Sequence, residues 1–305
     1  MYFPYLRGRQ YDLLAIKALV QNDLINENIV PVIEPVKMSS TLANTIQVCK
    51  TKGFKIALIL NPVVGDLESE DINSLKDIIA APIMPAIIMN KDAGSILSDL
   101  EQKEVDKSSV LIVLSNPDYV EEYKKLFTGT AHNYTLFPDE RGFRRAVIGN
   151  KVLFEDKFHK LNKNADYAYN EDEFFSDDHI FYESEGYKGF GDYSIIGKDY
   201  EESGFAPRAV AIHIVYIDKE KRLRVHHFVS DSNYGIEDIA GKYYEAVLKL
   251  KKWVQNGYEN QITDALSVLI EHASTGYFPG LPTIKKLSIM HHLELVRKIL
   301  DKEFA

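Results

Sequence analysis

The sequence has 305 residues, a formal net charge of -9 and a hydrophobic content of 45%. This length suits one barrel domain of ordinary size or two small domains, and this hydrophobic content is normal for a globular protein with a sizeable core. The acidic balance disfavours a general nucleic-acid binder, because neutralising phosphates supplies most of that affinity. A single cysteine, Cys49, excludes an intrachain disulfide and is typical of a reducing compartment.

The hydropathy pattern indicates neither a signal peptide nor a membrane-spanning segment. The opening residues, MYFPY, lack a charged segment followed by a long apolar stretch. No apolar run reaches the length of about 18 residues that suggests a spanning helix. The sequence therefore predicts a soluble, cytoplasmic protein that does not contact a membrane.

Short apolar segments rich in β-branched residues alternate with helical segments through the first half of the chain. Six of these segments predict strands at residues 2–8, 29–35, 55–62, 84–90, 110–117 and 133–139, and residues 151–154 predict a seventh. Apolar periodicity or capping residues predict helices between them, at residues 11–22, 39–52, 93–101 and 117–127. This alternation indicates a parallel sheet, and its repetition favours a TIM-barrel-like α/β fold.

The pattern changes after the seventh strand. Residues 162–187 are rich in Asn, Asp, Glu, Tyr and Phe, and the segment is too long and polar for an ordinary barrel loop, which indicates a functional or partly disordered insertion. Residues 191–197 predict the last strand, and residues 209–217 and 222–229 predict an antiparallel β-hairpin with a turn at 218–221. Helices are predicted at residues 236–255, 261–275 and 283–303.

We therefore expect two regions. The first is a TIM-barrel-like α/β domain over residues 1–200, with residues 162–187 as an inserted loop. The second covers residues 205–305, in which the β-hairpin and a helical C-terminal region pack on the barrel.

The opening of the chain, YFPYLRGRQYDLLA over residues 2–15, resembles the start of the phage-type beta-protein family. These are proteins of bacteria and phages named after a beta protein of a T-even phage. The Glu34-Pro35 and Asn61-Pro62 strand ends are further points of similarity, as is Gly191-Asp192-Tyr193 ahead of the hairpin. The resemblance implies a barrel-like fold and a phage or mobile-element setting, including host–phage conflict. It supplies no catalytic residues.

Acidic side chains lie where several predicted strands end, which is where the site of a parallel barrel lies. These residues are Glu34, Asp139, Glu155, Asp156 and Asp192. Oxygen-rich clusters of this kind suit Mg²⁺ or Ca²⁺, or paired acid–base catalysis, and Glu34 with Asp192 is the candidate catalytic pair. The alternative is a set of structural salt bridges to nearby arginines, which are Arg7, Arg9, Arg141 and Arg144.

Arg7 and Arg9 flank Gly8 where the first predicted strand meets its helix. Two guanidinium groups beside an accessible backbone suit a phosphate or carboxylate ligand. In the alternative arrangement, Arg7 pairs with an acidic side chain, for which Glu34 is the candidate, at another strand end. Asparagines end further predicted strands. Each of them either adds a polar group to the site at the strand ends or caps the helix that follows. The candidate ligand-binding residues are Arg7, Arg9, Asn61, Asn90, Asp139, Arg141 and Glu155.

Two later segments carry possible interaction surfaces. Residues 141–163 form a local basic patch with interleaved phenylalanines that can grip a nucleic acid, although nearby acids favour a solvated face with salt bridges. Residues 167–187 set many aromatic side chains among acids, so the 162–187 loop, or the hairpin, can anchor another protein. The loop can also close over the barrel as a lid, or pack its own aromatic side chains as a surface excursion.

Histidines on the predicted hairpin are candidate metal ligands. His226 and His227 are adjacent, so in a strand they face opposite ways and cannot both bind one metal ion without distortion. The sequence has no second cysteine and no His-x-x-x-His spacing, so zinc is disfavoured.

Two classes of function remain open. The first is a partner- or ligand-binding barrel protein of phage or mobile-element origin. The second is a metal-assisted phosphodiester or phosphoryl hydrolase with its site at the C-terminal ends of the strands. Binding is slightly favoured, because the sequence identifies no nucleophile or established acid–base pair.

Overall fold

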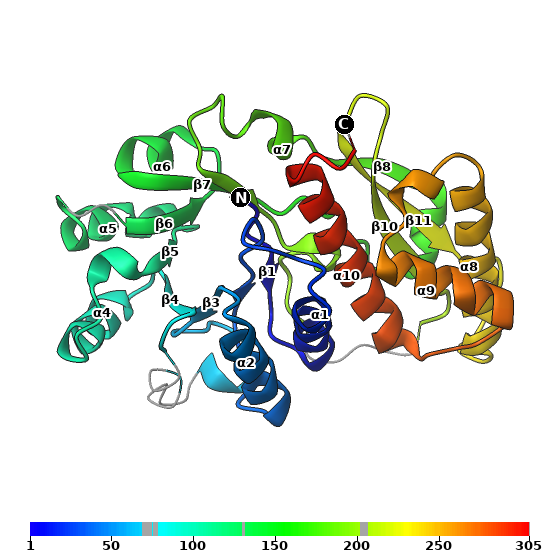
Figure 1. The fold of residues 1–305 in the computed structure, drawn as a ribbon, viewed down its shortest axis with the longest axis horizontal. Helices are drawn as coiled ribbons and strands as arrows, with labels where there is room; N and C mark the ends of the chain where they lie inside the picture. The colour runs from blue at the N-terminus through cyan, green and yellow to red at the C-terminus, as the bar shows by residue number, and fades with distance from the viewer. Residues whose placement is uncertain (69–74, 76–78, 130–131, 202–206, 305) are drawn as a thin grey trace. The chain divides into compact units, whose positions relative to one another are not determined.

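The computed structural model describes residues 1–68, 75, 79–129, 132–201 and 207–304 (Figure 1). The chain divides into two compact units. The barrel unit comprises residues 1–156 and 178–193, and the second unit comprises residues 157–177 and 194–305. The expected domains met at residues 200–205. The boundary differs because residues 157–177 join the second unit, where they add a strand to its sheet.

Within the described residues, the barrel unit contains eight parallel strands in the order β1-β2-β3-β4-β5-β6-β7-β9. The strands are β1 (Tyr5–Leu6), β2 (Val32–Ile33), β3 (Ile56–Ile59), β4 (Ile83–Ile88), β5 (Leu111–Val113), β6 (His132–Phe137), β7 (Gly149–Phe154) and β9 (Gly189–Gly191). The helices are α1 (Gln10–Gln21), α2 (Ser40–Lys52), α4 (Ala93–Gln102), α5 (Val120–Leu126), α6 (Arg141–Ala146) and α7 (Asp178–Phe181). The 3₁₀ turns are η1 (Asp66–Glu68), η2 (Lys107–Ser109) and η3 (Pro117–Tyr119).

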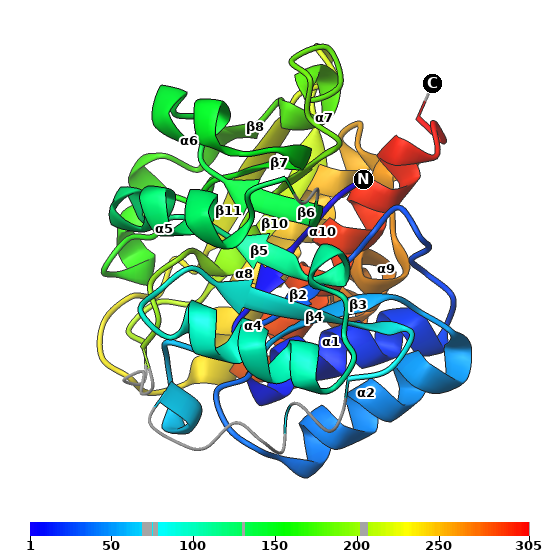
Figure 2. The same cartoon turned by 90° about the vertical axis from the view of Figure 1, so that its left-hand side faces the viewer.

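Helices lie between successive strands of this unit, and Figures 1 and 2 show α1, α2, α4 and α5 on the outside of the strands. Local signals set the ends of helix α2. Ser39 Oγ accepts a hydrogen bond from the Leu42 N–H, and Gly53 ends the helix with a φ of 64°. The expected TIM-barrel-like α/β fold is confirmed.

The barrel closes where β9 meets β1. The Phe3 N–H donates to the Phe190 carbonyl oxygen, and the Tyr5 N–H donates to the Asp192 carbonyl oxygen, each at 2.8 Å. A Cβ at Gly189 would lie 2.7 Å from a Phe3 ring atom, and one at Gly191 would lie even closer to the Phe3 carbonyl oxygen. Glycines therefore allow this close approach of two strands.

The interior of the barrel is filled by alternate residues of the strands. Members of the buried core cluster are Phe3, Tyr5, Val30, Val32, Ala57, Ile59, Met84, Ala86, Leu111, Val113, Leu136, Val152, Phe154 and Tyr193. Because successive side chains of a strand face opposite ways, this series identifies the inner face of each strand. The same alternation, continued past the strand ends, predicts which rim side chains face inward.

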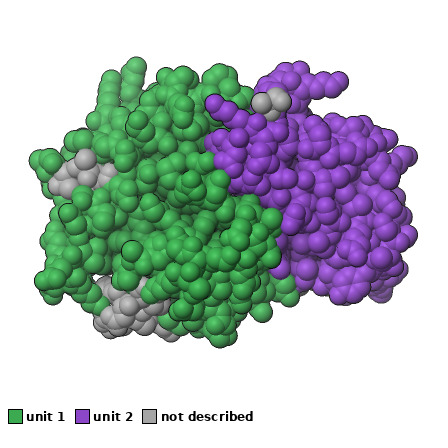
Figure 3. All heavy atoms as spheres, in the orientation of Figure 1, with its two compact units in different colours: residues 1–156, 178–193 green, residues 157–177, 194–305 purple. Residues whose placement is uncertain are grey.

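The second unit, coloured separately in Figure 3, is built on an antiparallel sheet, which has three strands in the order β10-β11-β8 within the described residues. Its elements are η4 (Asn164–Tyr169), β8 (Asp172–Ser176), η5 (Ser194–Ile196), β10 (Ala211–Ile217), β11 (Leu223–Val229), α8 (Ile239–Gln255), η6 (Glu259–Gln261), α9 (Asp264–Thr275) and α10 (Leu281–Leu300). The expected hairpin and helical C-terminal region are confirmed. The last barrel strand ends at Gly191, not at residue 197 as expected, because residues 194–196 turn into a 3₁₀ helix.

Among the residues that the structure describes, every helix is too short or too polar to cross a membrane.

Candidate functional site

The ends of β1 and β2 bring Arg7 and Glu34 together. Both residues continue the inward-facing series of their strands. Arg7 Nη1 donates to Glu34 Oε2, and the Glu34 side chain is fully buried whereas that of Arg7 is 10% exposed. Gly8 makes room for this pairing, since its φ is 62° and an added Cβ would lie 2.8 Å from the Glu34 carbonyl oxygen.

Glu34 accepts further hydrogen bonds from the protein. The Tyr5 hydroxyl donates to Oε2 at 2.7 Å, and the Val63 N–H donates to Oε1 at 2.8 Å. The Arg7 guanidinium also lies 5.4 Å from the centre of the Tyr5 ring and 5.5 Å from that of Tyr193. Both carboxylate oxygens of the candidate catalytic acid are therefore engaged.

Burial and nearby charges together set the pKa values of this cluster. Burial lowers the pKa of the Arg7 guanidinium, but the Glu34 carboxylate together with Tyr5 and Tyr193 outweighs burial, and the pKa is raised. Burial, aided by Glu34, raises the pKa of the Tyr5 hydroxyl well above its ordinary value. Arg7 therefore stays charged and Tyr5 stays protonated, which matches the salt-bridge alternative for Arg7.

Asn61 and Asn90 meet at the ends of β3 and β4. Asn61 Nδ2 donates to the Ile88 carbonyl oxygen at 2.7 Å, and Asn61 Oδ1 accepts from the Ile88 N–H at 2.9 Å. Its side chain thus pairs with a backbone segment of β4 as a neighbouring strand would. Asn90 Oδ1 accepts from Asn61 Nδ2 at 3.1 Å and from the Asp92 N–H at 3.0 Å. These contacts differ from the capping alternative, because Asn61 bonds to strand β4 rather than to the helix that follows it, and Asn90 holds the turn before α4, whose N-cap residue is Asp92.

Asp139 and Glu155 form a separate group near β6 and β7. The Asp139 N–H donates to Glu155 Oε1 at 3.2 Å, and the Tyr187 hydroxyl donates to Asp139 Oδ1. Arg144 lies 3.3 Å from the same carboxylate. Arg141 is exposed at the start of α6. Arg9, another candidate ligand-binding residue, is the N-cap residue of α1.

Asp192 is not brought to the Arg7–Glu34 pair. Its neighbour Tyr193 belongs to the inner core, so alternation turns Asp192 outward, where Oδ1 accepts from the Tyr2 hydroxyl at 2.8 Å. Asp156, two residues after the inward-facing Phe154, is exposed. The alternating side-chain directions along each strand are the signal in the sequence that could have predicted an inward-facing Glu34 and an outward-facing Asp192.

The two later segments are each divided between the units. Residues 157–163 of the basic patch and residues 162–177 of the expected loop belong to the second unit, whereas 141–156 and 178–187 belong to the barrel unit. In the patch, Lys160 pairs with Glu201 at 3.3 Å. In the loop, Tyr167 and Phe175 are buried while Tyr169 is 91% exposed, so its aromatic side chains are split between core and surface.

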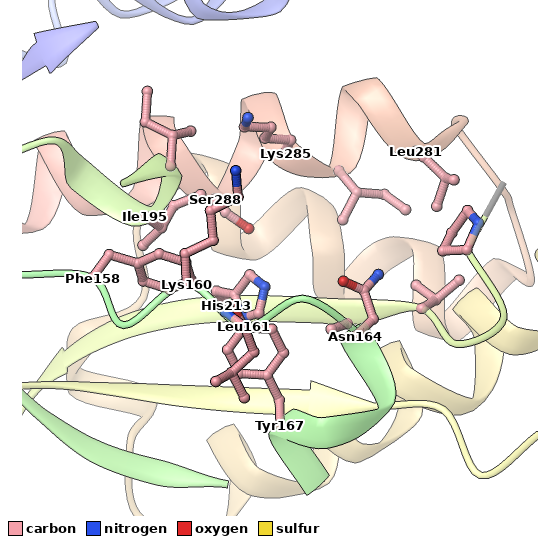
Figure 4. A pocket seen from close by; sticks show the side chains of 15 residues that line it. Phe158, Lys160, Leu161, Asn164, Tyr167, Ile195, His213, Leu281, Lys285 and Ser288 are labelled. Atoms are coloured by element: carbon pink, nitrogen blue, oxygen red, sulfur yellow. Dashed lines mark hydrogen bonds between the residues drawn. The ribbon is translucent and has the colours of Figure 1, made fainter. Parts of the chain in front are cut away.

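A pocket of about 260 Å³ lies within the second unit (Figure 4). It is lined by residues from four segments of the unit. The lining residues are Phe158, Lys160, Leu161, Asn164 and Tyr167; Ile195 and Ile196; Pro207, Val210, Ala211 and His213; and Leu281, Ile284, Lys285 and Ser288 of α10. Apolar side chains form most of this lining, and Lys160 and Lys285 add cationic groups. Figure 4 shows Lys160, Ser288 and His213 directed into the same space.

The hairpin register explains why the sequence did not reveal the histidine at this pocket. A four-residue turn at 218–221 would pair Ile217 with Arg222 and would set His213 opposite His226. The observed loop is one residue longer, because Ile217 pairs with Leu223, and His213 therefore lies opposite His227. His213 Nδ1 lies 2.7 Å from His227 Nδ1, and His227 Nε2 lies 3.2 Å from Glu173 Oε1.

Within the described parts of the chain, no cluster of three or more His, Cys, Asp or Glu side chains has the arrangement of a metal site. The expectation of Mg²⁺ or Ca²⁺ at the strand ends stays a prediction.

No protein-family model matches the chain, and no curated protein matches it. Among solved structures, the chain is similar to a chain of the tryptophan synthase α2β2 complex of Pyrococcus furiosus, with a TM-score of 0.39 and 14% sequence identity. The match covers 64% of this chain and 87% of that chain. A similarity of this size indicates nothing about the ligand or activity of this protein.

Proposed function

We propose that this protein binds a small organic anion in the pocket of the second unit, and that the barrel is a scaffold rather than a catalytic site. One observation carries the proposal. The pocket combines an apolar wall with the cationic side chains of Lys285 and of Lys160, the second of which pairs with Glu201. An apolar cleft with a few polar groups is the usual form of a small-molecule site.

The size of the pocket limits the ligand. A cavity of about 150 Å³ is large enough for benzene. The 260 Å³ of this pocket therefore suits a single ring, or a chain of similar bulk, that carries one anionic group. A charge-assisted hydrogen bond from Lys285 to that group contributes about 1.5–3 kcal/mol to binding.

The barrel rim supports the same proposal. Its candidate carboxylates accept hydrogen bonds from the protein itself, and these residues are Glu34, Asp139, Glu155 and Asp192. A metal-assisted hydrolase needs carboxylate oxygens that can turn to a metal ion or a substrate. The hydrolase alternative stays a hypothesis that no specific contact favours.

The setting of this function is also part of the proposal. The resemblance of residues 2–15 to the phage-type beta-protein family supports a phage or mobile-element origin, including a role in host–phage conflict. Contact with another protein through residues 162–187 or the hairpin stays a prediction.

Calorimetric titration with benzoate and with phenyl phosphate tests the proposal. We expect at least one of the two probes to bind, and Lys285→Ala to weaken that binding about tenfold or more. Lys252→Ala is the matched control, because Lys252 is an exposed lysine of α8 outside the pocket lining. The loss of binding is assigned to the pocket if Lys252→Ala binds the probe as the parent does and if both variants have the melting temperature of the parent.

Two results would contradict the proposal. The first is that neither probe binds the parent at millimolar concentration. The second is that Lys285→Ala and Lys252→Ala bind equally well, which would move the anion away from this pocket.

A further inference from the structure

Three polar side chains lie in a line across the sheet of the second unit. His213 of β10 is directly opposite His227 of β11. Glu173 of β8 pairs with Val225, so it is a diagonal neighbour of His227 on the adjacent strand. The line ends at the pocket, because His213 is one of its lining residues whereas His227 and Glu173 are not.

The hydrogen bonds along this line fix the position of each proton. An ionised carboxylate only accepts, so the contact of 3.2 Å requires His227 Nε2 to donate to Glu173 Oε1. A neutral imidazole carries a single N–H, which leaves His227 Nδ1 as an acceptor. The contact of 2.7 Å between the two Nδ1 atoms then requires His213 Nδ1 to donate. His213 Nε2 is therefore the ring nitrogen with a lone pair.

The environment keeps both rings neutral and in place. Burial lowers the pKa of His213 well below its ordinary value, and the positive charge of Lys285 lowers it further, as protonation of His227 would. Burial also lowers the pKa of His227, against the opposing effect of Glu173. The Tyr167 ring lies 4.6 Å from each imidazole ring, between centroids, and its hydroxyl is already engaged by the Leu161 N–H at 2.9 Å.

The pocket thus offers two different polar groups to a ligand. Lys285 offers a positive charge, and His213 offers a hydrogen-bond acceptor, since Nδ1 is used by His227. Figure 4 shows the His213 ring in the wall of the pocket, below Ser288.

We propose that His213 Nε2 selects the ligand by accepting a hydrogen bond from it, so that the pocket takes a small organic anion that also carries a hydroxyl group. The hydroxyl donates to His213, and the anionic group lies at Lys285. His227 and Glu173 are positioning residues that hold the proton on His213 Nδ1. This inference rests on the proposed function and adds a requirement for a donor on the ligand.

The first experiment measures the tautomers in the protein without any ligand. Long-range ¹H–¹⁵N correlation spectra of the imidazole rings distinguish a protonated ring nitrogen from a bare one. We expect His213 with its proton on Nδ1 and His227 with its proton on Nε2. A proton on His213 Nε2 in the parent protein overturns the proposal, whatever the protein binds.

A charge-reversing variant should reverse the donor and acceptor of each hydrogen bond along the line. In Glu173→Lys, an ammonium group can only donate to His227 Nε2, so the His227 proton moves to Nδ1 and the His213 proton moves to Nε2. Glu171→Lys is the matched control, because it makes the same charge change at an exposed neighbour outside the line. We expect the control to keep the parent tautomers. If Glu173→Lys does not fold, the parent spectrum and the ligand series below still decide the proposal.

The second experiment compares benzoate, its three hydroxy isomers and the corresponding methoxybenzoates. We expect at least one hydroxybenzoate to bind the parent about tenfold or more tightly than benzoate, and its methoxy analogue to lose that gain. In Glu173→Lys the preference for the hydroxyl should disappear, whereas benzoate itself should still bind. In Glu171→Lys the preference should remain.

The outcomes separate the two proposals. Equal binding of benzoate and all hydroxybenzoates overturns the role of His213 and leaves the proposed anion site standing. An absence of binding by every probe, including phenyl phosphate, overturns the proposed function and this inference with it. A hydroxyl preference that survives in Glu173→Lys after its tautomers have reversed also overturns the role of His213.

Discussion

The two units stabilise polar groups at their centres in different ways. In the barrel, a charged pair is buried, and Glu34 is surrounded by the donors Arg7, Tyr5 and Val63. In the second unit, burial lowers the pKa of several imidazole rings, namely His213, His227, His272, His291 and His292. Seven of the nine histidines of the sequence lie in this unit, and the other two of the seven are His159 and His226.

This difference indicates which unit can use its buried polar groups to bind a ligand. A buried ion pair is strongly destabilised when one partner is lost, so the barrel centre tolerates little exchange of its hydrogen bonds with a ligand. A neutral imidazole offers both a donor and an acceptor, and its tautomer is set by its neighbours. The second unit can therefore direct a lone pair at a pocket without burying an unpaired charge.

Removing the arginine from the barrel pair should have the largest effect. Arg7→Met leaves Glu34 as a buried carboxylate without its cation, and we expect a loss of about 3–5 kcal/mol in the free energy of unfolding. Urea-induced unfolding measures this loss. Arg9→Met, which removes a cation two residues away, should cost less than about 1 kcal/mol.

The double variant Arg7→Met with Glu34→Gln sharpens the comparison. Because a neutral amide replaces the unpaired charge, we expect the second substitution to recover most of the loss. If Arg7→Met alone is as stable as the parent, the charged pair does not stabilise the barrel.

Acidification should destabilise the second unit before the barrel. Burial lowers the pKa of His291 to about 4 and that of His292 to about 3. In the unfolded chain both bind a proton below a pH of about 6.5, so their contribution to stability is complete above that pH and is lost as the pH falls toward the folded-state values. Each unit of pKa difference corresponds to about 1.4 kcal/mol. Glu294, whose pKa burial raises, opposes this trend.

Native-state hydrogen exchange at pH 7 and pH 5 measures this effect in each unit. After correction for intrinsic exchange rates, the opening free energies of β10 and β11 amides should fall by about 1 kcal/mol or more, whereas those of β3 and β5 amides should change less. An equal decrease in both sheets would contradict the contrast between the units.

A methyl group added at Gly189, where the barrel closes against Phe3, should destabilise the protein. Gly189→Ala would place a Cβ 2.7 Å from a Phe3 ring atom, and we expect a cost of about 1–3 kcal/mol from overpacking. Gly142→Ala is the control, because Gly142 lies in helix α6 with no heavy atom within 4 Å of an added Cβ. Alanine there should be neutral or stabilising by about 0.5–1 kcal/mol. Thermal unfolding that ranks the two variants in the reverse order would argue against the close β1–β9 contact.

The smallest effect is expected from Tyr5→Phe. This variant removes one donor to Glu34 but leaves Arg7 and the Val63 N–H, so we expect a loss of about 0.5–1.5 kcal/mol. Urea-induced unfolding should rank it well below Arg7→Met. A loss as large as that of Arg7→Met would contradict the larger role of the guanidinium, because the hydroxyl would then stabilise the buried carboxylate as much as the charged group does.

The barrel was predictable because each buried parallel strand reads as a continuous apolar run, and the strand–helix repeat is local in the sequence. The pairing of Arg7 with Glu34 was one of the two expected alternatives, since both residues end adjacent strands. Asp192 was less predictable, because it lies one residue away from the inward-facing Tyr193 and a shift of one residue reverses the face.

The pocket could not be predicted from the sequence for related reasons. Its His213–His227 contact depends on a hairpin loop that is one residue longer than the turn residues indicate. Glu173, which forms a line of hydrogen bonds with these two histidines, lies in a segment that reads as a polar insertion, and only the pairing of β8 with β11 brings it beside them. Long-range pairing of this kind leaves no periodic signal in the sequence.

The most direct test of the central claim is the location of the bound anion. Methyl NMR spectra recorded during a benzoate or hydroxybenzoate titration report on both units at once. We predict chemical-shift changes at the pocket residues Ile195, Leu281 and Ile284, with little change in the barrel at Val63, which contacts Glu34, and at Ile88, which contacts Asn61. Changes at Val63 and Ile88 without changes at the pocket would contradict the account and return the ligand site to the barrel.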